Sequence, residues 1–363
     1  MRFPEFTGEW MKCKFGEIAT GFDYGMNAAA KPYDGQNKYI RITDIDEVSS
    51  TYNNSSIVSP DGILSENYVV NEGDILLART GASTGKSYLY RKSDGKLYYA
   101  GFLIRANVAE HNPYFVFSQL HTHRYWRWVS IMSARSGQPG INSLEYASFP
   151  IFTTTLKEEN KISSLLSLID KRIATQTKII EKLQSLIKGI AQNIVLRNKP
   201  NVRISQCLEC SSSTLQESDV WEYGAYPVYG ANGVVGFLDN YNTSNEAIYI
   251  IKDGSGVGAV SYVAGKCSAT GTLNILQAKK GFSLRYLYYL LNIFNFEPYK
   301  TGMAIPHIYF KDYGKAQIFC PSYSEQLKYA KFLATIDDKL LTEQNVLINL
   351  SLQKQYLLRQ MFI

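Results

Sequence analysis

Residues 156–199 read LKEENKISSLLSLIDKRIATQTKIIEKLQSLIKGIAQNIVLRNK, and apolar side chains recur in this stretch at alternating gaps of four and three. This spacing places one apolar seam along a long helix. A second seam follows 167 residues later at the same register. Two helices, each about 60 Å long at about 1.5 Å per residue, are therefore predicted to pair with each other. The seam positions are Ile162, Leu166, Ile169, Ile173, Gln176, Ile180, Leu183, Ile187, Ile190 and Ile194, then Tyr329, Leu333, Ile336, Leu340, Glu343, Leu347, Leu350, Lys354, Leu357 and Met361.

The start of each predicted helix carries the same signal. Thr155–Glu158 has the form of a capping box, and Ser322–Glu325 repeats it at the same offset. Pro200 ends the first helix. Because a whole domain separates the two helices, we expect them to pair in an antiparallel manner within the chain. The predicted organisation is a first domain at 1–155, a helix at 156–199, a second domain at 200–322 and a helix at 323–363.

The two domains resemble each other in outline. Each has an extended run that ends in a glycine-rich turn, at 73–85 and 248–258, and a second strand-like run follows each turn. Each closes with a glycine-containing loop, at 137–141 and 302–306. We predict two α+β domains of short twisted strands, each with at least one buried helix, and a pseudo-two-fold internal repeat of domain and helix.

Composition bounds the class of protein. The chain of 363 residues is 45% hydrophobic and long enough for two domains with real cores. The chain has five cysteines, an odd number, and its N-terminus lacks a secretion signal, so we expect reduced thiols in the cytoplasm. No run of about 18 apolar residues occurs, so no membrane span is expected. The net charge of +6 lies on the two helices. The domains are neutral, with 15 basic and 15 acidic residues at 1–155 and 9 of each at 200–322. The helices have 9 basic and 4 acidic residues at 156–199, and 5 basic and 4 acidic residues at 323–363.

Several short motifs imitate catalytic or ligand sites. Gly81–Ser87 resembles a phosphate loop, but it has three residues between its glycines and precedes a strand-like run. Gly254–Gly258 resembles a cofactor loop, again with a strand after it. Cys207 and Cys210 form a lone CxxC pair without a second pair. Both glycine turns are better explained as turns with unusual backbone angles, and no catalytic residue, metal site or cofactor is predicted in this chain.

Taken together, the chain resembles the specificity subunit of type I restriction-modification enzymes over its whole length. The shared features are Ile169-Asp170 and Ile336-Asp337 in the duplicated helices, Trp10 with Phe15–Ile18, Tyr39–Ile45, the run from Gly73 to Gly81, and Tyr226–Gly233. The resemblance implies two target-recognition domains that each read one half of a bipartite, asymmetric DNA sequence. It also implies an antiparallel coiled coil that sets the spacer between the halves.

The resemblance further implies partners. Two modification subunits would dock on the helices and methylate adenine with S-adenosylmethionine, and a restriction subunit with an ATP-driven translocase and nuclease that use Mg2+ would join them. The chain itself would then be non-catalytic. Two alternatives stay open, namely a specificity subunit whose partner carries both methyltransferase and nuclease, and a coiled-coil adaptor that binds no DNA.

Arg and Lys read guanine in the major groove, and Asn and Gln read adenine. Because loops and turns enter the groove most readily, the DNA-binding candidates are Arg79, Lys86, Arg91, Lys92, Arg135, Gln138, Asn232, Lys252, Lys266 and His307. On the first helix, Lys157, Lys171 and Lys178 lie opposite the seam and are expected to face the modification subunits or DNA.

One seam position breaks the repeat, because Lys354 stands where the first copy has Ile187. We expect one of three outcomes: the coiled coil loosens there, Lys354 meets an acidic group of a docked subunit, or its side chain reaches out into water.

Overall fold

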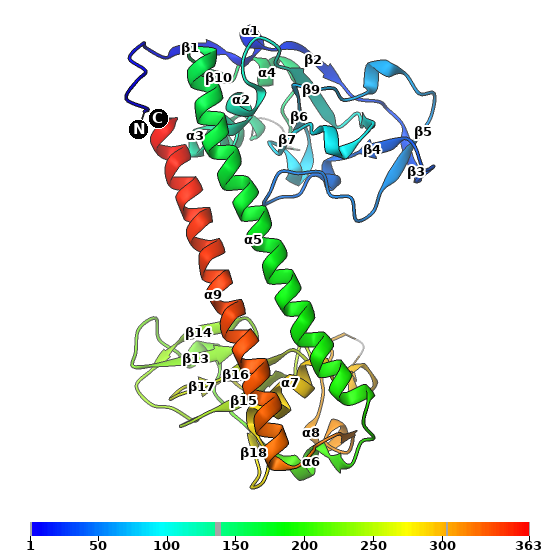
Figure 1. The fold of residues 1–363 in the computed structure, drawn as a ribbon, viewed down its shortest axis with the longest axis vertical. Helices are drawn as coiled ribbons and strands as arrows, with labels where there is room; N and C mark the ends of the chain where they lie inside the picture. Colours follow the sequence, from blue (N-terminus) through cyan, green and yellow to red (C-terminus); the bar gives the residue numbers. More distant parts are fainter. Residues whose placement is uncertain (1, 135–138, 303, 363) are drawn as a thin grey trace. The chain divides into compact units, whose positions relative to one another are not determined.

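The computed structural model describes residues 2–134, 139–302 and 304–362. Two long helices dominate it, α5 at Leu156–Leu196 and α9 at Tyr323–Met361, and each is drawn as one continuous coil in Figure 1. α5 ends three residues before the predicted limit at Lys199. In the described part of the chain, no helix is both long and apolar enough to span a bilayer.

The chain divides into two compact units, and both include part of each long helix. The first unit is Met1–Thr175 with Leu347–Ile363, and the second is Gln176–Val346.

A four-stranded sheet in the order β2-β9-β6-β7 forms the centre of the first unit, beside the two-stranded sheets β1-β10, β3-β5 and β4-β8. The strands are β1 Met11–Lys14, β2 Thr20–Tyr24, β3 Ala29–Pro32, β4 Lys38–Ile40, β5 Val58–Asp61, β6 Asp74–Ala78, β7 Ser87–Leu89, β8 Leu97–Tyr99, β9 Leu103–Asn107 and β10 Pro150–Thr153. The helices are α1 Phe15–Ile18, α2 Pro113–Gln119, α3 His123–Ser133 and α4 Ser143–Ala147.

The second unit repeats this plan. Its four-stranded sheet has the order β12-β18-β15-β16, with β14-β13-β17 and β11-β19 as further sheets. The strands are β11 Val202–Arg203, β12 Leu208–Ser212, β13 Tyr226–Gly230, β14 Gly233–Leu238, β15 Ala247–Ile251, β16 Val260–Val263, β17 Ser268–Ala269, β18 Leu273–Ala278 and β19 Gln317–Ile318. The helices are α6 Ile204–Cys207, α7 Leu284–Ile293 and α8 Phe310–Tyr313. The predicted pair of α+β domains is confirmed.

Antiparallel pairing of the helices is visible inside each unit. In the first, Ile162 and Leu166 near the start of α5 share one core with Leu357 and Met361 near the end of α9. In the second, Ile194 near the end of α5 shares a core with Ala330 near the start of α9. All twenty seam positions are buried or half-buried. The apolar heptad positions are therefore explained by burial, because pairing of the helices removes these side chains from water.

The polar seam position present in both copies also has a partner. The Gln176 side-chain amide donates to the Glu343 carbonyl oxygen at 3.0 Å and to the Glu343 carboxylate. Both residues belong to the second unit. A buried polar pair of this kind costs stability but fixes the register of a coiled coil.

The outcome at Lys354 is a fourth one that the sequence did not suggest. Its ammonium lies 2.6 Å from the Asp170 carboxylate, inside the same unit. The expectation that its side chain reaches out into water was therefore wrong, because Lys354 is half-buried and paired. The loosened seam and the acidic group of a docked subunit stay predictions. A charged side chain stays in a half-buried seam when an opposite charge of the same core neutralises it.

Candidate nucleic-acid interface

Each domain holds its glycine-rich turn against its closing loop. In the first domain, Gly81 N donates to Pro139 O at 3.0 Å and Ile141 N donates to Arg79 O at 2.9 Å. In the second, Gly254 N donates to Pro306 O at 2.9 Å and Ile308 N donates to Lys252 O at 2.9 Å. The same two backbone hydrogen bonds thus build the same junction twice. We name these places the loop–turn junctions, residues 79–85 with 139–141 and residues 252–258 with 304–308.

The turns need their glycines for backbone reasons, as predicted. Gly85 has φ +92°, and a Cβ there would lie 2.7 Å from Val129 Cγ1. Gly254 has φ +95°, a conformation that L side chains rarely adopt. A strand follows each turn, β7 and β16. A nucleotide loop opens an α-helix whose N-terminus faces the phosphate, whereas a strand follows each turn here, so residues 79–89 and 252–263 do not have that arrangement.

A cation precedes each turn at the same place. Arg79 and Lys252 both offer their carbonyl oxygen to the closing loop, and both side chains are half-buried. The Arg79 guanidinium lies over the Tyr24 ring, 4.7 Å from its centroid. A hydrogen bond from Ser143 holds the pKa of Tyr24 below its ordinary value. Within residues 2–134, 139–302 and 304–362, neither cation has a carboxylate partner, so both charges are available to an anion.

The other candidates of the first domain are dispersed. Lys86 follows the turn, but its ammonium lies 3.2 Å from the Glu47 carboxylate. Arg91 and Lys92 lie beyond the far end of β7, where Lys92 pairs with Glu72 at 2.7 Å and is largely exposed. Only Arg79 therefore lies within the first junction. Lys86 follows it directly, and Arg91 and Lys92 lie at the other end of the β6–β7 hairpin. Arg135 and Gln138 lie outside the described residues.

The second junction carries an open pocket of 370 Å³. Lys252, Asp253, Tyr309 and Lys311 line it. The His307 ring lies against the Tyr309 ring, with centroids 4.9 Å apart, and the Lys311 ammonium lies 5.1 Å from the same ring centroid. Sequence reasoning found Lys252 and His307 but missed Tyr309 and Lys311. Their place directly after the closing loop was the signal that could have identified them.

Asn232 and Lys266 do not belong to this pocket. Asn232 is exposed in the β13–β14 hairpin turn. The Lys266 ammonium lies 4.9 Å from the Tyr241 ring centroid and 5.7 Å from that of Tyr226, at the start of β13. These two candidates flank opposite ends of β13, apart from each other.

Arg124, near the start of α3, packs inside the first domain. The Arg124 guanidinium lies 4.4 Å from the Phe152 ring centroid and donates to Pro150 O at 3.1 Å, and burial lowers its pKa. It supports the domain core instead of facing a ligand. All five cysteines are free thiols, and within the described ranges no group of His, Cys, Asp and Glu side chains could hold a metal ion.

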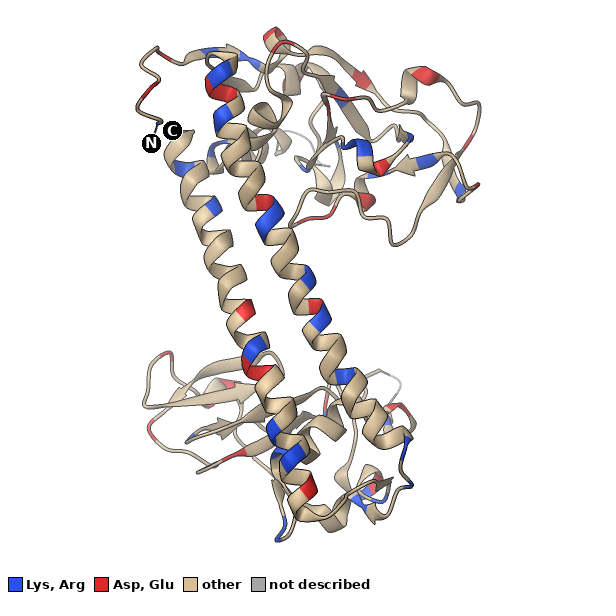
Figure 2. Ribbon diagram, viewed as in Figure 1, with Lys and Arg blue, Asp and Glu red and all other residues tan. Residues whose placement is uncertain are grey.

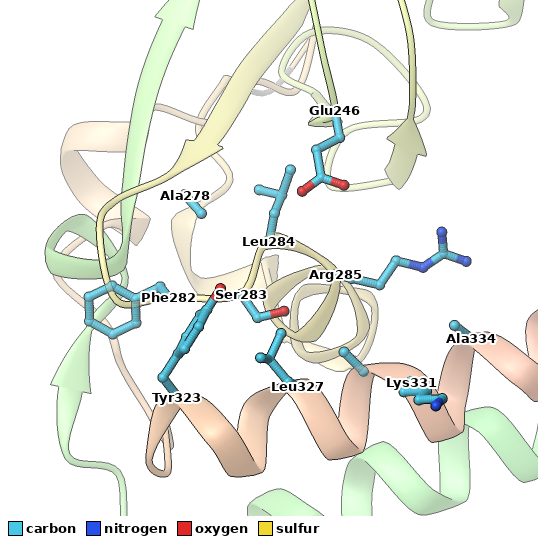
Figure 3. A pocket seen from close by; sticks show the side chains of 11 residues that line it. Glu246, Ala278, Phe282, Ser283, Leu284, Arg285, Tyr323, Leu327, Lys331 and Ala334 are labelled. Atoms are coloured by element: carbon cyan, nitrogen blue, oxygen red, sulfur yellow. The ribbon is translucent and has the colours of Figure 1, made fainter.

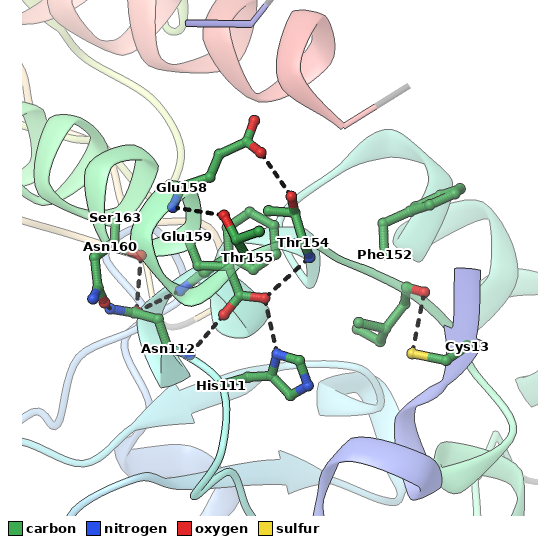
Figure 4. Close-up of polar contacts among 12 residues, drawn as sticks. Cys13, His111, Asn112, Phe152, Thr154, Thr155, Glu158, Glu159, Asn160 and Ser163 are labelled. Atoms are coloured by element: carbon green, nitrogen blue, oxygen red, sulfur yellow. Dashed lines mark hydrogen bonds and ion pairs between the residues drawn. The ribbon is translucent and has the colours of Figure 1, made fainter. Parts of the chain in front are cut away.

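Each domain is fastened to its long helix by a matched pair of side chains. Near the start of α5, the buried Glu159 carboxylate accepts from Asn112 N at 2.9 Å, from Thr154 N at 3.3 Å and lies 2.9 Å from His111 Nδ1 (Figure 4). Gln326 stands 167 residues later on α9, and its amide oxygen accepts from Ser283 N at 2.9 Å. Asn112 and Ser283 are the N-caps of α2 and α7, so the same contact orients the same helix in both units.

The second fastening uses the repeated Ile-Asp motif. Asp170 accepts from the Tyr114 hydroxyl and pairs with Lys354. Burial, reinforced by Asp170, raises the pKa of Tyr114, so its hydroxyl stays protonated and donates. Asp337 accepts from the Tyr289 hydroxyl at 3.2 Å and from the Arg285 guanidinium at 3.5 Å. Tyr114 and Arg285 occupy the same position, two residues after their N-caps.

Comparison with known proteins agrees with this architecture. A family model described as "Type I restriction modification DNA specificity domain" matches residues 8–185 and 201–350. The specificity subunit of the type I restriction enzyme EcoprrI of Escherichia coli is 25% identical over 126 residues, which are 35% of this chain and 30% of that subunit. The aligned segment therefore spans less than a third of that relative.

Two solved structures share the fold. The S subunit of a type I restriction-modification system from M. genitalium matches with a TM-score of 0.68 at 17% identity, over 98% of this chain and 96% of that one. A chain solved to describe complex assembly and conformational transition of the type I R-M system matches with a TM-score of 0.54 at 15% identity, over 97% of each chain. The family model covers most of both domains and both helices, so this chain belongs to the type I restriction modification DNA specificity domain family.

Proposed function

We propose that this chain is the DNA sequence-recognition subunit of a type I restriction-modification complex, in which each domain reads one half of a bipartite, asymmetric site. The observation that carries the proposal is the duplicated loop–turn junction, with one backbone frame and two different sets of side chains. Arg79 beside Tyr24 occupies one, and Lys252 beside Tyr309 occupies the other. Because the two junctions have the same backbone hydrogen bonds but different side chains, they would contact different bases, as recognition of two different half-sites requires.

The chemistry of the junctions supports contact with DNA. Loop cations without carboxylate partners suit phosphate oxygens and the O6 and N7 atoms of guanine. Tyr309 adds a hydroxyl and a ring that is nearly half exposed. The pairing of Lys86 with Glu47 and of Lys92 with Glu72 makes these two lysines weaker candidates than Arg79 and Lys252.

The helices would set the spacer between the half-sites and dock two modification subunits. A helix of fixed length is a stiff element, so it would keep the separation of two half-sites constant. S-adenosylmethionine, ATP and Mg2+ would then act only in the partner subunits, as would adenine methylation and cleavage. Double-stranded DNA, two modification subunits and a restriction subunit are the proposed partners.

The decisive experiment exchanges residues 200–322 for the same segment of a relative, within the complete complex, and maps methylated adenines on DNA. We expect one half of the recognised sequence to change while the other half and the spacer stay the same. A change in both halves, or in neither, would contradict the two-domain reading. A purified complex without any sequence preference among random duplexes would instead support a coiled-coil adaptor.

Point variants test the junctions themselves. Arg79→Ala should weaken DNA binding and relax the preference in the first half-site only, and Lys252→Ala should do so in the second half-site only, each by about 1–3 kcal/mol if a base is contacted. Lys92→Ala is the matched control on the same hairpin, because it removes an exposed lysine away from the junction. Binding measured at two salt concentrations separates base contact from phosphate contact, since loss of a phosphate contact lowers the salt dependence.

A further inference from the structure

Three strands of the central sheet in the first domain meet beside the junction cation. β9 lies between β2 and β6 and is antiparallel to both, so the end of β2, the start of β9 and the end of β6 lie at one end of the sheet. Tyr24 is the last residue of β2, Phe102 comes just before β9, and Arg79 comes just after β6. We name these three residues the first sheet end.

The second domain repeats this arrangement with other side chains. β18 lies between β12 and β15 and is antiparallel to both. Ser212 is the last residue of β12, Thr272 comes just before β18, and Lys252 comes just after β15. We name these three residues the second sheet end. Arg79 N donates to Phe102 O at 3.0 Å and Lys252 N donates to Thr272 O at 3.0 Å, so the positions correspond.

The turn that carries Phe102 is held firmly by its surroundings. Gly101 N donates to Met26 O at 2.8 Å. Gly25 lets the turn pack closely, because a Cβ there would lie 2.2 Å from Ala100 O. Phe102 is nevertheless 59% exposed. A fixed turn that holds a large apolar side chain in water is preorganised for contact with an apolar group of a ligand.

The two sheet ends offer different chemistry. Tyr24 is 41% exposed, and its ring lies beneath the Arg79 guanidinium, so two exposed aromatic residues accompany the cation of the first sheet end. In the second sheet end, Ser212 and Thr272 carry hydroxyl groups, and Ser212 is exposed. The first sheet end is therefore aromatic with one cation, whereas the second combines hydroxyl groups with one cation.

Neither net charge nor pocket size identifies a ligand of the domains. Basic and acidic residues are interspersed along both domains (Figure 2), in agreement with their equal numbers. Another open pocket, of 540 Å³, lies between the beginnings of α7 and α9, and Figure 3 shows Glu246, Arg285 and Lys331 around it. Charges of both signs thus line that pocket. The side chains of the sheet ends are more selective, because each set favours one kind of contact.

Thymine is the base that an apolar ring recognises in the major groove. Its C5-methyl group is the apolar group that the base pairs present there, and Phe makes apolar contact with it. An Arg beside that ring suits the O6 and N7 atoms of guanine. The first sheet end therefore fits a T·A pair next to a G·C pair. The hydroxyl groups and the amine of the second sheet end instead suit hydrogen-bonding atoms of the base edges.

We propose that Phe102 reads the C5-methyl group of thymine in the half-site bound by the first domain, whereas the second domain reads its half-site without such a contact. The inference rests on the proposed function and deepens it, because it assigns one feature of a base to one residue. Loss of one contacted methyl group should weaken binding about fourfold, as expected for one buried carbon.

The experiment measures binding of the complete complex to a duplex that holds the recognised sequence, with deoxyuridine in place of thymidine in one half-site at a time. Deoxyuridine lacks only the methyl group and still pairs with adenine. We expect replacement in the first half-site to weaken binding about fourfold for each contacted thymine, and replacement in the second to change it by less than about twofold. Equal effects in the two half-sites, or no effect in the first, would overturn the proposal.

Variants of the turn assign the effect to Phe102. Phe102→Thr introduces the residue of the matching position, Thr272, and should bind the thymine duplex as weakly as the parent complex binds the uracil duplex. Phe102→Leu keeps an apolar side chain and should remain sensitive to the methyl group. Ile63→Thr is the matched control, because Ile63 is 93% exposed and follows β5 of a separate sheet. A Phe102→Thr complex that still distinguished thymine from uracil would refute the assignment.

Failure of this inference differs from failure of the proposed function. A complex that bound all duplexes equally, whatever their sequence, would contradict DNA recognition by this chain. A complex that selected its sequence but tolerated uracil throughout the first half-site would contradict only the role of Phe102.

Discussion

The two ends of the helix pair use different chemistry to fasten two similar domains. In the first unit, a buried carboxylate, Glu159, holds the N-cap of α2, and Asp170 is shared by Tyr114 and Lys354. In the second unit, a neutral amide, Gln326, holds the N-cap of α7, and Asp337 is shared by Tyr289 and Arg285. The repeated positions make the same contact with the N-cap of a helix, but a carboxylate makes it in the first unit and a neutral amide in the second. The first unit therefore depends more on ionised groups than the second.

The largest effect is expected where a buried carboxylate is removed. Glu159→Ala would leave the backbone N–H groups of Asn112 and Thr154 without their acceptor and should destabilise the first unit by about 3 kcal/mol. Gln326→Ala, the matched change, should cost the second unit about 1–2 kcal/mol because one neutral hydrogen bond to the α7 N-cap is lost. Hydrogen exchange of the α2 and α7 amides measures both. Equal losses of stability in the two variants would show that the charge of Glu159 is unimportant.

The next effect concerns the repeated aspartates. Asp170→Ala removes the partner of Lys354 from a half-buried seam, as well as the acceptor of Tyr114, and should destabilise the first unit by about 2 kcal/mol. Asp337→Ala should lower the unfolding free energy of the second unit by about 1 kcal/mol, because the Asp337 contacts with Tyr289 and Arg285 are longer than the Asp170 contact with Lys354. Thermal unfolding of the two variants gives the ranking. A greater loss from Asp337→Ala would reverse the comparison.

Restoring the symmetry of the seam tests whether Lys354 and Asp170 act as a pair. Lys354→Ile introduces the residue found at the matching position, Ile187, and leaves Asp170 without its cation, so we expect a loss of about 1 kcal/mol. In an Asp170→Asn background the same change should be neutral or stabilising, because no charge is then left behind. A double-mutant cycle measures the coupling. Additive effects would show that the pair contributes nothing.

The smallest effect is a dependence on acid in the first unit. Burial, and then Lys354, lower the pKa of His121 from 6.5 to about 4, while its ring nitrogens contact Phe117 O and the Ser50 hydroxyl. The unfolded chain binds this proton more readily, so the contribution of His121 is present above pH 6.5 and is lost as the pH falls toward 4. His121→Gln should reduce the loss of unfolding free energy between about pH 7 and pH 5.5 by about 1 kcal/mol. His123→Gln, at an exposed histidine, is the control and should leave the profile unchanged.

Much of the fold follows from local patterns. The alternating gaps of the seam predicted both helices and their pairing, because periodicity alone decides which side chains share a face. The glycine turns were predicted as backbone features, since the strand-like run after each one argued against a helix N-terminus. The site was predicted only in part. Arg79, Lys252 and His307 lie at the loop–turn junctions, but Arg91, Lys92, Asn232 and Lys266 lie elsewhere, because composition does not tell which loops meet.

The sequence by itself thus determined the architecture of domain, helix, domain and helix, its internal repeat and the antiparallel helix pair. Only the tertiary structure decided the partners of single side chains. Lys354 illustrates the difference, because heptad spacing marks it as an anomaly, whereas its neutralisation by Asp170 depends on which turns of α5 and α9 lie side by side. Seam spacing is a property of each helix alone, but lateral contacts arise only when two segments far apart in the chain pack together.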